Sequence, residues 1–188
     1  MRKLESIIFF LFISLLSNGQ MLPLTDQQLI KTSENIVSGT ILSSKAKWVN
    51  NGKYIYTFSK LKVDKVYSGD VKVGDTVSIV VPGGYDPVKD IGMQVSEQAA
   101  FDTGEETVVF LVKAEGESDA VDYTFLKNDR SISPKQMRVN GYFQGKRKIF
   151  LDKKTGLKMI NIPNEGKNIE LRTHNEKISS ALKLQKKK

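Results

Sequence analysis

Residues 74–112 read GDTVSIVVPGGYDPVKDIGMQVSEQAAFDTGEETVVFLV, and this stretch decides the fold. Thr76–Val81 is a β-rich run that Pro82-Gly83-Gly84 stops, and Thr107–Val112 is a second run launched from the turn Asp102-Thr103-Gly104. The connection between the two runs is long and broken by glycines. We therefore expect two core strands joined by an exposed loop.

The preceding residues predict a long hairpin. Asn35–Val49 and Tyr54–Tyr67 read as strands, and Asn50-Asn51-Gly52-Lys53 between them supplies the positive φ angles of a tight turn. Gly39 lies on the inward face of the first strand, where a glycine marks a bend or a close backbone approach. The apolar face of the second strand switches after Phe58, which predicts a β-bulge near Phe58–Lys60.

Both ends of the chain predict helices. Thr25 and Gln28 have the spacing of a capping box, so a short helix should run to about Ser33. A second capping box at Thr173–Glu176 predicts a terminal helix that packs weakly, because it offers few large apolar residues. Between the helices, the further segments expected as strands are Tyr123–Leu126, Met137–Gly145, Lys146–Asp152 and Leu157–Ile162.

These elements predict a mainly β fold. We expect a small closed or partly open antiparallel barrel of the OB-like type, with five to six strands, a short N-terminal helix and a C-terminal helical extension. The expected division is a signal peptide at 1–19, an N-terminal helical segment at 20–34, the barrel at 35–152 and a basic extension at 153–188.

The first residues have the pattern of an export signal. Arg2-Lys3 precedes the apolar run Ile7–Leu16, and Ser17 and Gly19 place small residues before a cut after Gly19. The run is shorter than the ~20 residues of a membrane span. We expect an exported protein, periplasmic or secreted, with no membrane span after cleavage. An uncleaved anchor is the alternative.

The amino-acid composition limits which kinds of catalytic and metal-binding sites the protein can have. The chain has no cysteine, which excludes disulfides, thiolate metal sites and a cysteine nucleophile, and an exported chain without disulfides suggests a bacterium. His174 is the single histidine, expected as an exposed residue of the helix cap. Glu105 and Glu106 should point to opposite faces of a strand, and Asp86 with Asp90 lacks EF-hand spacing. We therefore expect no catalytic residue, no metal and no cofactor.

Charge is unevenly distributed along the chain. Residues 21–126 carry 10 Lys/Arg against 15 Asp/Glu, a net charge of −5, whereas residues 127–188 carry 17 against 5, a net charge of +12. Such asymmetry is typical of a surface that binds polyanions or envelope components, and it also fits a solvated lysine-rich face.

Several short motifs occur in an order that resembles a group of exported, uncharacterised bacterial β-domains. The motifs are Val66-Tyr67-Ser68-Gly69, Val73-Gly74-Asp75-Thr76-Val77, Val81-Pro82-Gly83-Gly84, Phe101–Glu106 with Val108–Leu111, and Gly141–Lys146. The layout of that group is similar to the OB-like barrel of the netrin-module and metalloproteinase-inhibitor superfamily. Those inhibitors chelate zinc through an N-terminal cysteine, which this chain lacks.

Two functional hypotheses follow. The first is a non-enzymatic, inhibitor-like module that binds a protein partner through the loop after residue 82, with Gly83, Gly84, Tyr85, Asp86 and Phe101 as contact residues. The second is a protein that binds anionic glycan or lipid headgroups through Lys146, Arg147, Lys148, Lys153 and Lys154. Nucleic acid is not an expected partner of an exported protein.

Overall fold

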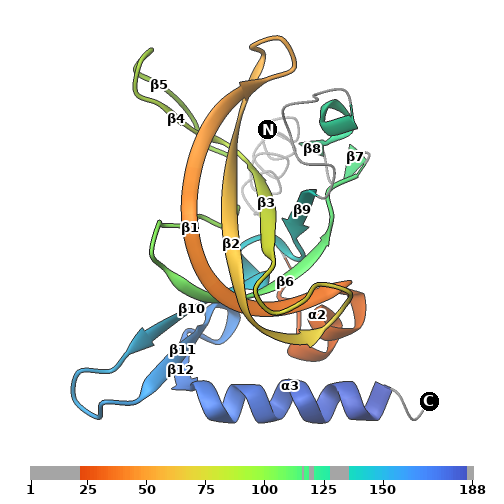
Figure 1. The fold of residues 1–188 in the computed structure, drawn as a ribbon, viewed down its shortest axis with the longest axis vertical. Helices are drawn as coiled ribbons and strands as arrows, with labels where there is room; N and C mark the ends of the chain where they lie inside the picture. Colours follow the sequence, from red (N-terminus) through yellow and green to blue (C-terminus); the bar gives the residue numbers. More distant parts are fainter. Residues whose placement is uncertain (1–21, 116, 119–120, 128–135, 186–188) are drawn as a thin grey trace, which may run out of the picture.

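The computed structural model describes residues 22–115, 117–118, 121–127 and 136–185 (Figure 1). The expected signal peptide lies outside this part of the chain. Within the described residues, no helix combines the length and the apolar character that crossing a membrane requires. The sequence folds into a curved sheet with a helix near each end of the described chain (Figure 1).

Strands dominate the structure, as expected. The helices are α2 (Asp26–Thr32) and α3 (Leu171–Gln185), with 3₁₀ turns η1 (Thr124–Lys127), η2 (Tyr142–Gly145) and η3 (Pro163–Glu165). The strands are β1 (Asn35–Val49), β2 (Tyr54–Ser68), β3 (Thr76–Pro82), β4 (Gly84–Asp86), β5 (Ile91–Met93), β6 (Glu106–Lys113), β7 (Glu117–Ser118), β8 (Val121–Asp122), β9 (Gln136–Val139), β10 (Lys146–Leu151), β11 (Lys158–Ile162) and β12 (Lys167–Glu170).

Five of the described strands form a ring in the order β1-β2-β3-β9-β6, which closes because β1 also pairs with β6. All pairings are antiparallel except β3 with β9. That parallel seam has only the rungs Ser78–Gln136 and Ile79–Met137, so the barrel is partly open there. The expected class, a mainly β partly open barrel with a helix at each end, is confirmed.

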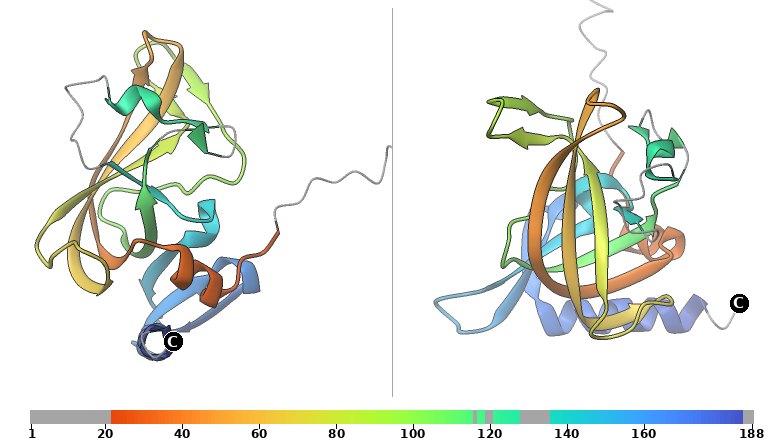
Figure 2. Two further views of the ribbon diagram at one scale, coloured as in Figure 1. Left: turned by 90° about the vertical axis from the view of Figure 1, so that its right-hand side faces the viewer. Right: turned by 45° about the horizontal axis from the view of Figure 1, so that its top comes forward.

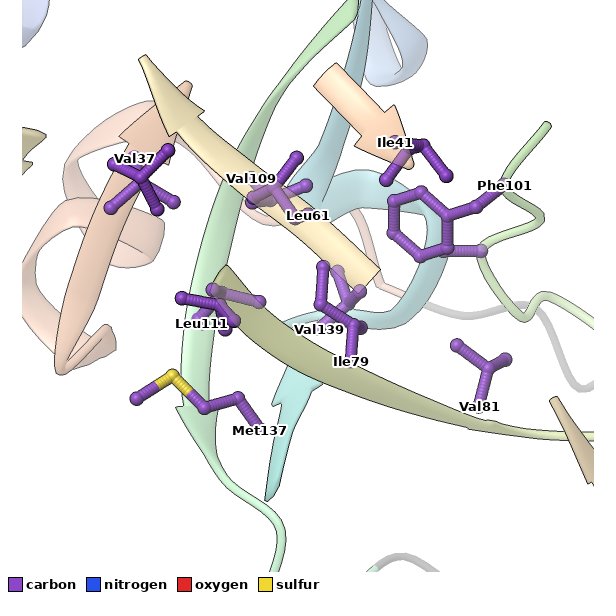
Figure 3. Close-up of a cluster of buried hydrophobic side chains, with 13 residues drawn as sticks. Val37, Ile41, Leu61, Ile79, Val81, Phe101, Val109, Leu111, Met137 and Val139 are labelled. Carbon is purple, nitrogen blue, oxygen red and sulfur yellow. The ribbon is translucent and has the colours of Figure 1, made fainter. Parts of the chain in front are cut away.

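The inside of the ring is a continuous apolar core (Figure 3). Alternate residues of the ring strands point inward, as the period of two requires. The buried members of this barrel core are Val37, Ile41, Leu61, Val63, Val77, Ile79, Val81, Ala99, Phe101, Val109, Leu111, Met137 and Val139.

A second core lies on the outer side of β1 and β6, where α2, α3 and β11 cover them. Its buried members are Leu29, Ile30, Ile36, Val108, Phe110, Ile149, Ile160, Ile162 and Ile178. The expectation that the terminal helix packs weakly is wrong, because Ile178 is 1% exposed within this core and Tyr67 donates a hydrogen bond to Asn175. The helix begins at Leu171, so Thr173 lies in its first turn and does not cap it.

The strand expected at Met137–Gly145 is shorter than expected, because β9 ends at Val139 and the 3₁₀ turn η2 follows. β9 and β10 pair with successive parts of β6, at Leu111–Val139 and Val109–Lys146, and η2 lies between them. Gly141 has a φ of 70°, which turns the chain out of the sheet. The segment expected as a strand at Tyr123–Leu126 is largely the 3₁₀ turn η1.

The long hairpin confirms two expectations and corrects a third. Residues 50–52 all have positive φ in the turn, and a Cβ on Gly39 would lie 1.9 Å from the carbonyl oxygen of Lys62. No extra residue lies at Phe58–Lys60, however. The register of β1 against β2 shifts between Ile41 and Ser43, where the extra residue is in β1, and at two places nearer the other end of the hairpin, where the extra residues Asp64 and Tyr67 are in β2. The switch of apolar face in β2 has another cause: Tyr56 packs outside the barrel with Tyr123.

Candidate functional site

The loop singled out in the sequence forms a small hairpin, β4–β5, that projects from one end of the barrel (Figure 2). Gly83 and Gly84 make the sharp exit from β3, with φ of 100° and 147°. A Cβ on Gly83 would lie 2.8 Å from the carbonyl oxygen of Met93, and one on Gly84 would lie 2.8 Å from Cβ of Ala46. Both glycines are therefore required by the backbone conformation, and without side chains they allow the hairpin to lie close against the barrel.

Trp48 of β1 anchors the hairpin. Its Nε1 donates a hydrogen bond of 2.6 Å to Oδ2 of Asp86, and Nζ of Lys89 lies 4.6 Å from the centre of the indole ring. The Trp48 hydrogen bond, together with the amides of Val88 and Lys89, holds the pKa of Asp86 below its ordinary value. Asp86, expected as a contact residue, is thus engaged within the protein.

A second hydrogen bond stiffens the hairpin from within. The hydroxyl of Tyr85 donates to Oδ1 of Asp90 at 2.5 Å. This bond and nearby negative charge raise the pKa of Tyr85 above its ordinary value. Both aspartates of the hairpin therefore have partners inside the protein.

Three of the side chains that the hairpin presents to solvent are apolar, beside the exposed charged residues Lys89 and Asp90. Val88 is 92% exposed, Tyr85 54% and Ile91 46%. Exposed apolar residues scattered singly are ordinary, but three on one short protrusion are a candidate contact site. Tyr85 is opposite Gly92 and Ile91 is opposite Asp86, so Tyr85 and Ile91 lie on the two faces of the protrusion. We call Tyr85, Val88 and Ile91 the hairpin tip.

Phe101 does not join this surface. It is 6% exposed and belongs to the barrel core (Figure 3), and Nζ of Lys146 lies 5.0 Å from its ring centre. Lys146 in turn forms an ion pair of 2.7 Å with Glu105 and donates to the carbonyl of Ala100. Phe101 and Lys146, each expected at a binding surface, are packed together inside the protein.

Arg147 also differs from its expected role, because its side chain is fully buried. Its Nη2 lies 2.6 Å from Oδ1 of Asp26, and its Nη1 lies 2.6 Å from Nε2 of His174. The guanidinium stacks 4.9 Å from the ring centre of Phe110. We call Asp26, Arg147 and His174 the buried triad; it joins α2, β10 and α3 at one point.

The triad fixes the protonation of His174, which is 0% exposed and not the exposed cap residue that we expected. A guanidinium can only donate, so Nε2 of His174 must accept and the imidazole is neutral. Burial, and then the charge of Arg147, lower the pKa of His174 to about 4. Burial works to raise the pKa of Asp26, but the hydrogen bond and charge of Arg147 outweigh it and leave that pKa below its ordinary value.

The rest of the expected basic patch is at the surface. Lys148, Lys153 and Lys154 are exposed. Beside Lys148, β10 diverges from the turn at 102–106 and leaves a cavity of about 380 Å³, whose wall includes the ion pair of Lys158 with Glu106. The five residues of the patch are therefore split: Arg147 is buried, Lys146 is partly buried in its ion pair with Glu105, and the other three are exposed.

Chemically, these sites differ. In the described part of the chain, no group of three or more His, Asp or Glu side chains is placed to hold a metal ion. In the buried triad, Arg147 and His174 are closed to solvent and the Asp26 side chain is 33% exposed, and the three side chains tie secondary elements together. The hairpin tip offers apolar side chains on a braced support, which suits binding. The contribution of Trp48 was missed from the sequence, because a contact with a residue 38 positions away leaves no local pattern.

No protein-family model, curated protein or solved structure matches this chain. A functional assignment therefore rests on the geometry of the chain itself.

Proposed function

We propose that the protein is an exported, non-enzymatic binding module that inserts the hairpin tip into a cleft of a protein partner. The carrying observation is that Val88, Tyr85 and Ile91 face solvent on a hairpin whose aspartates already have internal partners. A convex apolar protrusion is complementary to a concave apolar site, as in an inhibitor-like contact.

Hydrogen bonds to the carboxylates of the hairpin favour such docking. Desolvating an unpaired carboxylate costs several kcal/mol. Asp86 and Asp90 already accept hydrogen bonds from Trp48 and Tyr85, so their negative charges do not enter the interface bare. Burial of the apolar side chains of the tip then contributes up to about 25 cal/mol per Å², against which the entropy cost of association is set.

The rigidity of the hairpin also favours binding of a protein partner through the hairpin tip. The hairpin is held by Trp48 from β1 and seated by Gly84 against Ala46. A loop that is ordered before binding loses less conformational entropy on binding, which raises affinity without new contacts.

Export is proposed from the N-terminal sequence, with its basic start, apolar run and small residues before Gly19. The periplasm or the extracellular space is then where the partner resides. The motif resemblance to exported β-domains agrees with this proposal, although the cysteine-dependent mechanism of the metalloproteinase inhibitors does not apply to a chain without cysteine.

Photo-crosslinking tests the proposal. A photoreactive amino acid is placed at Val88 or at Ile91 in chain 20–188, and the matched control carries it at Val73, which is 66% exposed away from the hairpin. Each protein is incubated with periplasmic and secreted extract, irradiated, washed with salt and denaturant, and analysed by mass spectrometry.

The expected result is one protein crosslinked from positions 88 and 91 and not from position 73. Val88→Asp should abolish its capture, whereas Val73→Asp should not. Equal crosslinking from all three positions, or capture that survives Val88→Asp, would refute binding through the hairpin tip.

A further inference from the structure

A second surface lies on the outer face of the long hairpin β1–β2. Four lysines, Lys45, Lys47, Lys60 and Lys62, are exposed along it. We call these four residues the lysine face. The right-hand view of Figure 2 shows β1, β2 and β3 side by side. Tyr123 and Leu126 cover Tyr56 and Val80 on the outer side of β2 and β3, and the four lysines remain exposed.

Strand register puts the four lysines on one face. Residues directly opposite in paired strands share a face, and Lys45 is opposite Phe58 while Lys60 is opposite Ser43. The residues between the lysines point the other way: Leu61, between Lys60 and Lys62, is buried in the barrel core. Lysines in one strand are then about 7 Å apart, and the strands about 5 Å apart.

The charge of the lysine face is available to a ligand. None of its lysines takes part in an ion pair among the described residues. The acidic residues at its border have other partners: Asp64 accepts a hydrogen bond from Thr40, and Glu106 pairs with Lys158 at 2.6 Å. By contrast, Lys146 and Arg147 form ion pairs with Glu105 and Asp26 of the protein itself.

Other side chains on this face suit a sugar. Ser43, Ser78 and Thr76 lie opposite Lys60 or Lys62, and their hydroxyls can donate and accept. Phe58 is half-buried among the lysines, with Nζ of Lys47 5.8 Å from its ring centre. The face thus combines a line of positive charge with hydroxyl groups and the edge of one aromatic ring.

We propose that the lysine face binds a linear anionic polysaccharide, with its carboxylate or sulfate groups on Lys45, Lys47, Lys60 and Lys62. This site is separate from the hairpin tip and does not depend on the function proposed for it. Ammonium groups on flexible stems act as point charges that follow a chain of spaced anions.

The composition of the face favours a glycan over the other polyanions. Single-stranded nucleic acid binds on exposed aromatic platforms, whereas Tyr56 is 4% exposed and Phe58 is half-buried. A membrane surface requires apolar side chains that insert beside the charges. In β1 and β2 the exposed large apolar residues are Leu42, at 49%, and Tyr54, at 36%, which lies at the start of β2 next to the turn.

Two variants with the same change in charge test this site. The first carries Lys→Gln at the four positions of the lysine face. The matched control carries Lys148→Gln, Lys153→Gln, Lys154→Gln and Lys183→Gln, all at exposed positions. Binding of heparin and of alginate to chain 20–188 is measured by titration at several salt concentrations, beside single-stranded DNA and vesicles of anionic lipid.

The lysine-face variant should bind the glycans at least about tenfold more weakly and with a lower salt slope, while the control should stay within about twofold of wild type. Equal losses in both variants, or a larger loss in the control, would refute the site. Tighter binding of DNA or vesicles than of either glycan would refute the proposed ligand.

Lysine acetylation of the wild-type protein provides a test that needs no variant. Saturating heparin should protect the four lysines of the face and leave Lys153 and Lys154 reactive. Protection that is uniform over the surface would overturn the proposal.

Discussion

The buried triad and the β4–β5 hairpin use hydrogen-bonded charged groups in different ways. In the triad, Arg147 is enclosed, and its ion pair and hydrogen bond hold α2 and α3 against the sheet. In the hairpin, Asp86 and Asp90 accept hydrogen bonds from neutral donors, Trp48 and Tyr85, and these bonds brace a protrusion that exposes three apolar side chains. Hydrogen bonds to charged groups therefore secure the fold in one place and support an exposed surface in the other. Substitutions in the triad should change stability, and those in the hairpin should change binding.

The largest effect is expected from Arg147→Met. It leaves Asp26 and His174 without their shared donor in a largely buried site, so the free energy of unfolding should fall by about 3 kcal/mol. Urea denaturation measures the change. The control is Lys148→Met at the next, exposed position, expected within about 0.5 kcal/mol of wild type. Equal effects of the two variants would contradict a structural role for the triad.

The second-largest effect is expected from acid, which should lower the free energy of unfolding through the buried triad. The pKa of His174 is lowered to about 4 from its ordinary value of 6.5, so the unfolded chain takes up the proton more readily than the folded one. The contribution of neutral His174 to the free energy of unfolding is complete above pH 6.5. This contribution is lost as the pH falls toward 4, by up to roughly 3 kcal/mol. The lowered pKa of Asp26 acts in the same direction at still lower pH.

Urea midpoints at pH 7, 5 and 4 measure this loss, and the variant His174→Gln provides the comparison. The variant should be less stable than wild type at pH 7 and should lose less stability between pH 7 and 4. Parallel curves for the two proteins would show that His174 is not the group responsible.

A smaller effect is expected from Asp86→Ala in the hairpin. It removes the acceptor of Trp48, the single tryptophan of the chain, so fluorescence reports directly on this anchor. The emission should shift and quenching by acrylamide should increase, while the free energy of unfolding should fall by only about 1 kcal/mol. Asp90→Ala, which frees Tyr85 instead, should leave the emission unchanged.

The smallest effect on stability is expected from Val88→Asp with Ile91→Asp at the hairpin tip. Both side chains already face solvent, so the free energy of unfolding should change by no more than about 0.5 kcal/mol. Urea denaturation checks this value beside the capture experiment. A loss as large as that of Arg147→Met would mean that the tip is part of the core and not a surface.

Local patterns were sufficient to predict most strands. The turn at Asn50–Gly52, the close approach at Gly39 and the capping box of α2 all depend on residues near in sequence, and all three are present. The extra layers outside the barrel were not predicted. Tyr56 faces away from the barrel core and is nevertheless buried, because the chain near Tyr123 returns to cover it.

The burial of Arg147 could have been predicted from the sequence. Within a strand, Lys146 and Lys148 must point to one face and Arg147 to the other, together with buried Ile149. Treating the three as one basic patch ignored this alternation. The burial of His174 had no such signal, since its partners Asp26 and Arg147 lie far away in the chain.

The pairing of β6 has a consequence for how the chain is made. β6 closes the ring against β1, some 70 residues earlier, and the second core is completed only by Ile178 of α3. A nascent chain that has emerged as far as β3 holds a hairpin and an added strand, but neither core. Contacts between such distant residues form slowly. α2 and β11 can cover the apolar outer face of β6 earlier, but the second core is completed only when the last helix is available.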